Sequence, residues 1–114
     1  MEIRLIVIRT KEQKRLANFY NLLGLTFDYH KHGNSPMHYS ATIGSLVFEI
    51  YPLTKNQTEA DKSTRLGFAI DNFEKTLDLL RNNGIAFSEP IQTDFGFLTI
   101  ISDPDGRKIE LYKK

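Results

Sequence analysis

The chain has 114 residues, carries 15 Lys and Arg against 14 Asp and Glu, and contains no cysteine. The length suits one ordinary domain, and a formal net charge of +1 argues against nucleic acid or an anionic membrane surface as a partner, because both need clustered positive charge. Without cysteine, disulfides, thiolate nucleophiles and zinc–cysteine sites are excluded. No apolar run approaches the ~20 residues of a spanning helix and the start does not resemble a signal peptide, so a soluble cytoplasmic protein is expected.

The first half of the chain has the pattern of one strand, one helix and three further strands. Residues 3–8 form an alternating β-branched run that is typical of a buried strand. Thr10 and Gln13 have the spacing of a capping box, which predicts a helix that Gly24 then ends as a left-handed cap. Turn residues separate the strands that we expect over 25–32, 38–43 and 46–51.

The second half repeats the same order. A strand is expected over 66–70, followed by a helix with Asp71 as its cap, Glu74 three residues on, and Gly84 at its end. Further strands are expected over 85–88, 97–101 and 108–112. Asp103-Pro-Asp-Gly106 is strong turn chemistry between the last two, because Pro fixes φ and Gly tolerates a positive φ.

Matching positions indicate that the two halves are copies of one βαβββ unit. Glu49 and Tyr51 in the last strand of the first half correspond to Glu110 and Tyr112 in the last strand of the second. We therefore expect a single domain over residues 1–114, made of module one (1–51), a polar linker (52–64) and module two (65–114).

Three stretches carry a family resemblance: Gly-Leu-Thr-Phe and Gly-Ile-Ala-Phe after the two helices, and the terminal Asp-Pro-Asp-Gly-Arg-Lys-Ile-Glu-Leu. With them the chain resembles, over essentially its whole length, the vicinal oxygen chelate superfamily of glyoxalase I, bleomycin-resistance proteins, fosfomycin-resistance enzymes and extradiol dioxygenases. The resemblance implies an α+β fold of two tandem βαβββ modules, with helices outside a curved, cup-shaped sheet. It also implies a homodimer, in which a second copy covers edge strands and apolar residues such as Leu5, Val7 and Val47.

The resemblance also implies where a metal would bind, because metal-dependent relatives take one ligand from the first strand and one from the last strand of each module. Those positions are Leu5, Glu49, Arg65 and Glu110 here. Leu5 and Arg65 cannot ligate a metal, and the guanidinium repels a cation. No metal cofactor is therefore favoured, and a divalent metal, if present, would rest on Glu49 and Glu110.

Arg65 is instead expected to replace the charge of the ion and to neutralise Glu49 or Glu110. The alternative is that both carboxylates are simply solvated on the open face of a sheet. Tyr51 and Tyr112 share a strand face with the glutamates, and either offer a ring and a hydroxyl to a ligand or pack between modules. The expected ligand-binding set is Leu5, Glu49, Tyr51, Arg65, Glu110 and Tyr112, with no catalytic residue assigned.

The three histidines form a separate group. His30 and His32 are two residues apart on an expected strand and share a face, while His38 follows across a short turn. Three imidazoles can converge on zinc or nickel. The sequence places no acidic partner beside them and the family keeps its metal elsewhere, so the favoured interpretation is that they are half-exposed polar residues.

The predicted function is that of a glyoxalase/bleomycin-resistance-like protein that binds a small organic molecule without a metal, in a cup lined by Glu49, Arg65 and Glu110. A neutral or anionic ligand suits Arg65 better than a cation does. The alternative is a divalent-metal-dependent lyase, isomerase or dioxygenase of the glyoxalase type, against which Leu5 and Arg65 argue. A non-catalytic sensor or assembly module is the third possibility.

Overall fold

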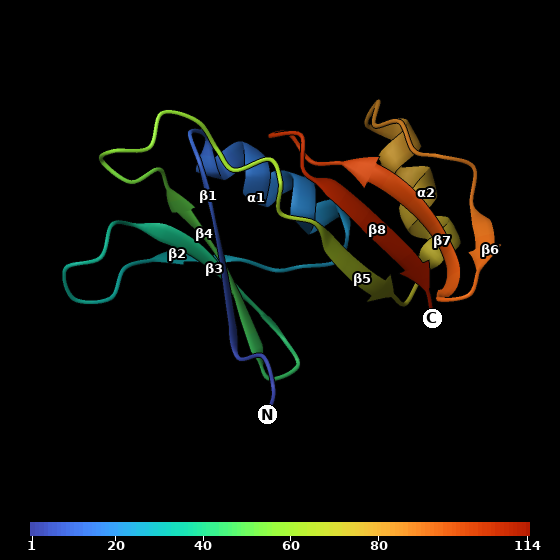
Figure 1. Cartoon of the computed structure of the whole chain (residues 1–114), viewed down its shortest axis with the longest axis horizontal. Coiled ribbons are helices and arrows are strands. Elements are labelled where there is room, and N and C mark those ends of the chain that lie inside the picture. The colour runs from blue at the N-terminus through green and yellow to red at the C-terminus, as the bar shows by residue number, and fades with distance from the viewer. The chain divides into compact units, whose positions relative to one another are not determined.

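The computed structural model describes residues 1–114 and divides into two compact units, Met1–Asp61 (unit 1) and Lys62–Lys114 (unit 2). Each unit has the order strand, helix, strand, strand, strand, and each has one four-stranded sheet (Figure 1). The predicted α+β fold of two tandem βαβββ modules is confirmed. Neither helix is long and apolar enough to cross a membrane.

Unit 1 is a mixed sheet with a helix on one face. Its elements are β1 (Leu5–Thr10), α1 (Gln13–Leu22), β2 (Asp28–His30), β3 (His38–Ile43) and β4 (Leu46–Pro52). The sheet order is β1-β4-β3-β2, with β1 parallel to β4 and the remaining pairs antiparallel. Tyr20 of α1 meets Phe48 of β4 edge-on, with ring centroids 5.2 Å apart, and this contact holds the helix on the sheet.

The two faces of the unit 1 sheet have different contents because successive side chains of a strand point to opposite sides. Ile8, Phe48 and Ile50 are buried and belong to the helix side. Val7 and Glu49 are register partners, so both belong to the opposite face, which α1 does not cover. We call this surface the open face of unit 1.

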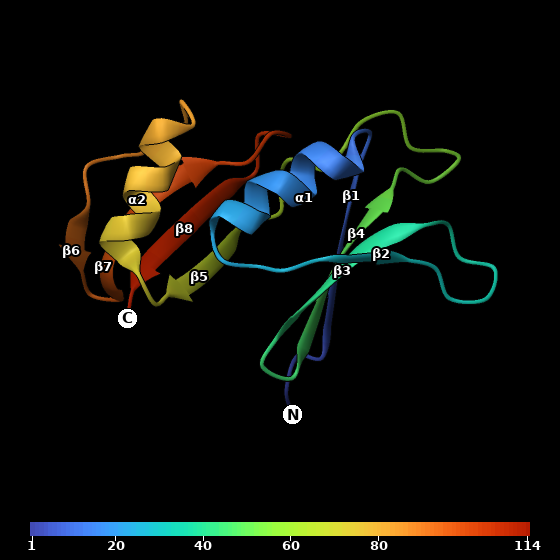
Figure 2. The same ribbon diagram turned by 180° about the vertical axis from the view of Figure 1, so that it is seen from behind.

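Unit 2 repeats the arrangement. Its elements are β5 (Leu66–Ile70), α2 (Phe73–Asn82), β6 (Ile91–Thr93), β7 (Gly96–Ser102) and β8 (Lys108–Lys113). The sheet order is β5-β8-β7-β6, again with one parallel pair, β5 with β8. Figure 2 shows α2 beside the β7–β8 pair, where Leu80, Ile109 and Leu111 are buried.

The strand register supports the equivalence of the two units. Val7 is opposite Glu49 in unit 1, and Gly67 is opposite Glu110 in unit 2. Glu110 therefore belongs to the open face of unit 2, as Glu49 does in unit 1. The two glutamates occupy matching places in matching sheets.

The turn between β7 and β8 is built around a buried arginine. Asp103 Oδ1 accepts the amides of Asp105 and Arg107, and Gly106 takes the positive φ of 95° that closes the turn. The Arg107 guanidinium lies 3.2 Å from Asp103 Oδ2 and 2.9 Å from Asp105 Oδ2. Burial acts to lower the pKa of Arg107, but the hydrogen bonds and charges of Asp105 and Asp103 outweigh it and raise the pKa.

The expected helix starts are wrong by one or two residues. Helix α1 begins at Gln13 after Glu12, and Thr10 Oγ1 accepts the Glu12 amide at 3.3 Å, so the threonine orders the approach to the helix without capping it. Helix α2 begins at Phe73 after Asn72, without a side-chain cap. The expected helix ends at Gly24 and Gly84 are confirmed by their positive φ values of 111° and 72°.

The first expected strand, 3–8, is shifted by two residues, because β1 covers Leu5–Thr10, and Leu5 and Val7 in it are exposed. Two other expected strands differ more. The first is shorter than 25–32, because β2 covers only Asp28–His30. The second, 85–88, is not a strand, and β6 lies further on, at Ile91–Thr93. Ser88 donates its amide to the Ile100 carbonyl, but its side-chain oxygen accepts the Ile100 amide where a strand would use a backbone carbonyl. Pro90, which has no amide hydrogen, then interrupts any ladder.

Candidate functional site

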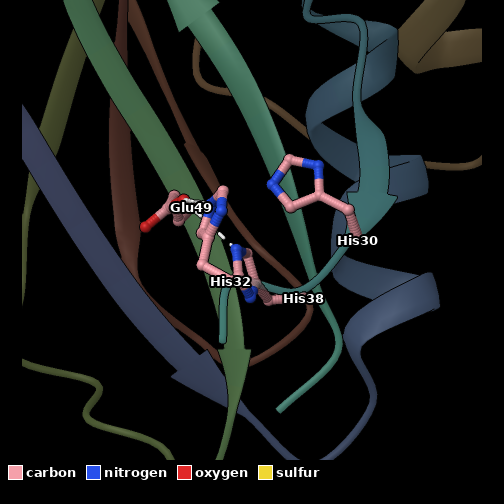
Figure 3. Close-up of side chains that lie close together, drawn as sticks. All are labelled: His30, His32, His38 and Glu49. Atoms are coloured by element: carbon pink, nitrogen blue, oxygen red, sulfur yellow. Dashed lines mark ion pairs between the residues drawn. The ribbon is translucent and has the colours of Figure 1, made fainter. Parts of the chain in front are cut away.

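The open face of unit 1 brings the three histidines of the chain to Glu49 (Figure 3). His30 ends β2, His38 begins β3, and the register places them opposite each other. His32 follows β2 by two residues. The register of β3 against β4 places Ser40 opposite Glu49, so His38, two residues before Ser40 on the same face, also lies beside this glutamate.

The distances within this cluster are short. One potential ligand atom from each of His30, His32, His38 and Glu49 lies within 4.8 Å of all the others. Glu49 Oε2 is 3.3 Å from His38 Nε2 and 3.9 Å from His32 Nε2. The His38 side chain is 0% exposed and that of Glu49 is 9% exposed, whereas that of His32 is 66% exposed. The cluster is therefore enclosed on the side of the sheet and open to solvent at His32.

The hydrogen bonding of His38 fixes its tautomer. His38 Nδ1 lies 2.9 Å from the carbonyl oxygen of Pro36, and a carbonyl can only accept, so Nδ1 carries a proton. In a neutral imidazole, Nε2 then presents a lone pair, and this nitrogen is buried without a hydrogen-bond partner. His30 Nε2 is buried and without a partner in the same way. A lone pair facing a carboxylate oxygen is an unfavourable contact unless a proton or a cation lies between them.

The other side of His38 packs against Tyr51, which in turn lies against Arg9. Its ring stacks on Tyr51, with centroids 4.1 Å apart and an interplanar angle of 12°. The Arg9 guanidinium carbon lies 5.0 Å from the centroid of the Tyr51 ring, and Arg9 Nη1 donates to the carbonyl of Pro52. The stacking leaves the His38 imidazole little rotational freedom, so its Nε2 keeps its direction towards Glu49.

The sequence places no acidic partner beside the histidines, whereas the structure places Glu49 there. The interpretation of the histidines as half-exposed polar residues is wrong for His38, which is fully buried. The sequence did contain a signal for the contact with Glu49. Gly44 forms the tight turn between β3 and β4, and counting outward from the pair Ile43 and Leu46 reaches Ser40 opposite Glu49. A register counted from this turn would have placed His38 next to the carboxylate.

On the open face of unit 2, Glu110 has different partners. Arg65 Nη2 lies 2.9 Å from Glu110 Oε2, and the Tyr112 hydroxyl donates to Glu110 Oε1 at 2.6 Å. The side chains of Arg65 and Glu110 are 61% and 27% exposed. The hydrogen bond to Glu110 raises the pKa of Tyr112, because a phenolate would lose that bond and face the carboxylate charge.

The structure thus pairs Arg65 with one of its two expected partners, Glu110, and pairs Glu49 with histidines. Tyr51 stacks on the ring of His38, which is not in the expected set, and Tyr112 donates to Glu110, which is. Leu5 lies on the edge strand β1 and is 56% exposed, which leaves it available to a ligand or to the expected second copy. The assignment of these six residues to ligand binding remains a prediction.

The positions at which metal-dependent relatives hold an ion do not fit a metal in this chain. Leu5 offers no donor atom, and Arg65 places a fixed positive charge at Glu110. Of the four positions, Glu49 is the one that offers a donor without an arginine paired to it, and a single carboxylate is too few for a site.

Comparison with known proteins identifies the family. The sequence model of the Glyoxalase/Bleomycin resistance protein/Dioxygenase superfamily matches residues 2–111, so the chain belongs to this superfamily. No curated protein sequence gives a significant match.

Solved structures share the fold. TnmS3, an antibiotic binding protein from Streptomyces sp. CB03234, is 21% identical with a TM-score of 0.77, covering 99% of this chain and 95% of that one. The oxidase ChaP-H2 is 15% identical with a TM-score of 0.80, covering 100% and 94%. A glyoxalase/bleomycin resistance protein from the same Streptomyces is 21% identical with a TM-score of 0.73, covering 98% and 100%. At such identities the likeness shows the fold alone.

Proposed function

We propose that the protein binds a small organic molecule, neutral or anionic, through Arg65 and the open face of unit 2, without a metal at the four family positions. The observation that carries the proposal is the Arg65–Glu110–Tyr112 network. Its carboxylate orients the guanidinium through Nη2, while the arginine side chain stays 61% exposed. A guanidinium has several N–H donors in a fixed fork, so an oriented and accessible one suits a carboxylate, phosphate or carbonyl group of a ligand.

Apolar side chains adjoin this network. Ile100 of β7 is the register partner of Glu110, so it shares the open face, and it is 37% exposed. Ile91 of β6 pairs with Leu98, which in turn pairs with Tyr112, and Ile91 is 57% exposed. A charged group beside accessible apolar surface is the combination that binds an organic molecule with a polar end and an apolar body.

Membership of the superfamily supports the class of ligand. TnmS3, which shares the fold, is an antibiotic binding protein, and binding of an organic compound is the function we carry over to this chain. A cup in which Glu49 joins Arg65 and Glu110 around one ligand remains a prediction. A divalent-metal-dependent lyase, isomerase or dioxygenase remains the second candidate, and it would need a metal outside the family positions.

The test uses an anionic aromatic probe, 8-anilinonaphthalene-1-sulfonate, titrated into the full chain and into two arginine variants. Arg65→Ala should weaken the saturable binding of the probe at least about tenfold, since a hydrogen bond to a charged group is worth about 1.5–3 kcal/mol. Arg81→Ala is the matched control, because Arg81 is 63% exposed and also pairs with a carboxylate, Asp78, but on helix α2. It should leave the affinity unchanged.

Equal affinities of the wild type and Arg65→Ala would refute the proposal. So would a loss of the same size in Arg81→Ala, because the probe would then respond to net charge and not to the open face. Circular dichroism of both variants checks that each is folded. The same titration format then serves to screen anionic and neutral organic compounds by displacement of the probe.

A further inference from the structure

We propose that His30, His32, His38 and Glu49 form a binding site for a divalent transition-metal ion, for which Zn²⁺ is the best fit, within unit 1. The site does not depend on the ligand-binding role of Arg65, because all four residues lie in unit 1 and Arg65 lies in unit 2. It shares one residue, Glu49, with the family positions and takes the other three from β2, the segment after it, and β3.

The donor set suits this class of ion. Imidazole nitrogen and carboxylate oxygen are both good ligands for Zn²⁺, and imidazole also suits Ni²⁺ and Co²⁺. Four such donors complete a tetrahedral site, with metal–ligand bonds of about 2 Å and ligand atoms about 3.3 Å apart. Glu49 Oε2 and His38 Nε2 already have this separation, at 3.3 Å, and His32 Nε2 is 3.9 Å from the same oxygen. Small side-chain movements bring the remaining donors, all within 4.8 Å, to the ion.

The buried nitrogens give a second and independent reason. His38 Nε2 is fully enclosed, has no hydrogen-bond partner, and is directed at the Glu49 carboxylate. His30 Nε2 is buried without a partner as well, beside the same group (Figure 3). A buried nitrogen without a partner is costly, and a cation between the imidazoles and the carboxylate satisfies these lone pairs and the carboxylate charge together.

The surroundings of His38 have the form expected of a metal ligand. A ligating histidine normally donates its other ring N–H to a carbonyl or carboxylate, which fixes the tautomer and the direction of the ring. His38 donates Nδ1–H to the carbonyl of Pro36 at 2.9 Å, and its ring is held by Tyr51. Its remaining nitrogen is thereby oriented before any ion arrives.

A proton shared between His38 and Glu49 explains less. It would turn their contact into an ion pair, but it would leave His30 Nε2 buried without a partner. It would also give no reason for His32, whose Nε2 lies 3.9 Å from Glu49, to turn towards the cluster. A metal ion accounts for all three imidazoles.

The composition of the chain leaves no histidine or cysteine outside the cluster that could bind the same ions. The three histidines of the cluster are all the histidines of the protein, and there is no cysteine. Every imidazole signal in a nuclear magnetic resonance spectrum therefore reports on this site. The protein must be untagged, because a polyhistidine tag would bind the same ions.

The experiment titrates the untagged full chain with Zn²⁺ by calorimetry and with Co²⁺ by visible absorption. We expect one ion per chain, a Co²⁺ spectrum of tetrahedral intensity, and shifts of the imidazole nitrogen signals of His30, His32 and His38. Glu49→Gln and His32→Gln should each weaken Zn²⁺ binding about 100-fold or more. Removing a residue that only hydrogen-bonds to a metal ligand already lowers metal affinity about 10–100-fold. His32 is exposed, so its variant keeps the fold even where substitution of the enclosed His38 does not.

Glu110→Gln is the matched control, because Glu110 occupies the equivalent position in unit 2. Its Zn²⁺ affinity should equal that of the wild type. If Glu110→Gln loses affinity as Glu49→Gln does, the ion rests on the family positions and the proposal is overturned. It is also overturned if the folded wild type shows no saturable binding of Zn²⁺ or Co²⁺, or if Glu49→Gln and His32→Gln bind as the wild type does.

Discussion

Glu49 and Glu110 hold the same place in two copies of one fold, yet they are neutralised in different ways. Glu49 is 9% exposed and faces imidazoles, whereas Glu110 is 27% exposed and is held by an arginine and a tyrosine hydroxyl. In unit 1 two imidazole nitrogens remain without partners, and in unit 2 both oxygens of the glutamate have donors. The backbone thus fixes where the carboxylate lies, and the neighbouring strands decide what it can bind.

The neighbours differ because of single residues at matching positions in the two units. Unit 2 has Arg65, directly before β5, where unit 1 has Leu5, and Gly67 where unit 1 has Val7, so an arginine reaches Glu110. A side-chain carbon added at Gly67 would already touch Glu110 at 3.9 Å. In unit 1 the corresponding residues of β1, Leu5 and Val7, are apolar. The imidazole partners of Glu49 come from the opposite side, from β2, the segment after it and β3.

The largest effect on stability should come from the turn between β7 and β8 of unit 2. The equivalent connection in unit 1, between β3 and β4, is only a tight glycine turn. Arg107→Ala removes the cation between Asp103 and Asp105, and breaking a buried pair costs about 3–5 kcal/mol. Urea denaturation of the variant should show this loss in the free energy of unfolding. In the absence of urea, the nuclear magnetic resonance signals of the unit 1 histidines should persist. Arg81→Ala, which breaks an exposed pair, should cost less than about 1 kcal/mol, and comparable losses in the two variants would contradict the prediction.

A smaller effect, of opposite sign in the two units, should follow when each glutamate becomes glutamine. In metal-free buffer, Glu49→Gln should raise the free energy of unfolding by about 1 kcal/mol, because the amide can donate to the lone pair of His38 Nε2. Glu110→Gln should lower it by less than about 1 kcal/mol, because it weakens an exposed pair with Arg65. A clear loss in Glu49→Gln would instead indicate a protonated His38 paired with Glu49.

The smallest effect concerns the phenol of Tyr112. Its pKa is raised above the ordinary tyrosine value by the hydrogen bond to Glu110, so the bond stabilises the fold below that ordinary value and the contribution is lost as pH rises through the raised pKa. Glu110→Gln should bring the pKa back towards about 10. Nuclear magnetic resonance of labelled tyrosine, assigned with Tyr112→Phe, measures the titration, and an unchanged midpoint would rule out Glu110 as the cause.

The fold could be predicted because its signals are local. Gly24 and Gly84 end helices by positive φ, and Asp103 with Gly106 makes a turn whatever lies elsewhere in the chain. The repeat then allowed one half to be checked against the other. Helix starts were placed less well, because the Thr10 hydroxyl binds an amide of the approach segment and does not cap the helix.

The histidine site could not be predicted by the same reasoning, because it depends on the pairing of three strands. His30 reaches His38 through one antiparallel pair, and His38 reaches Glu49 through the next. Each residue alone reads as an ordinary polar position, and only the combined registers bring them together. The partner of Arg65 was easier to predict, because Arg65 directly precedes β5, and β5 pairs with the strand that carries Glu110.

The order of strands in unit 1 also has a kinetic consequence. The sequence β2, β3, β4 is a meander of neighbouring antiparallel strands with short connections, whereas β1 must pair with β4 across the whole unit. Closing a short loop costs less conformational entropy than closing a long one, so local strands assemble before distant ones. His30, His38 and Glu49 all lie on the meander, so we expect them to come together before β1 pairs with β4.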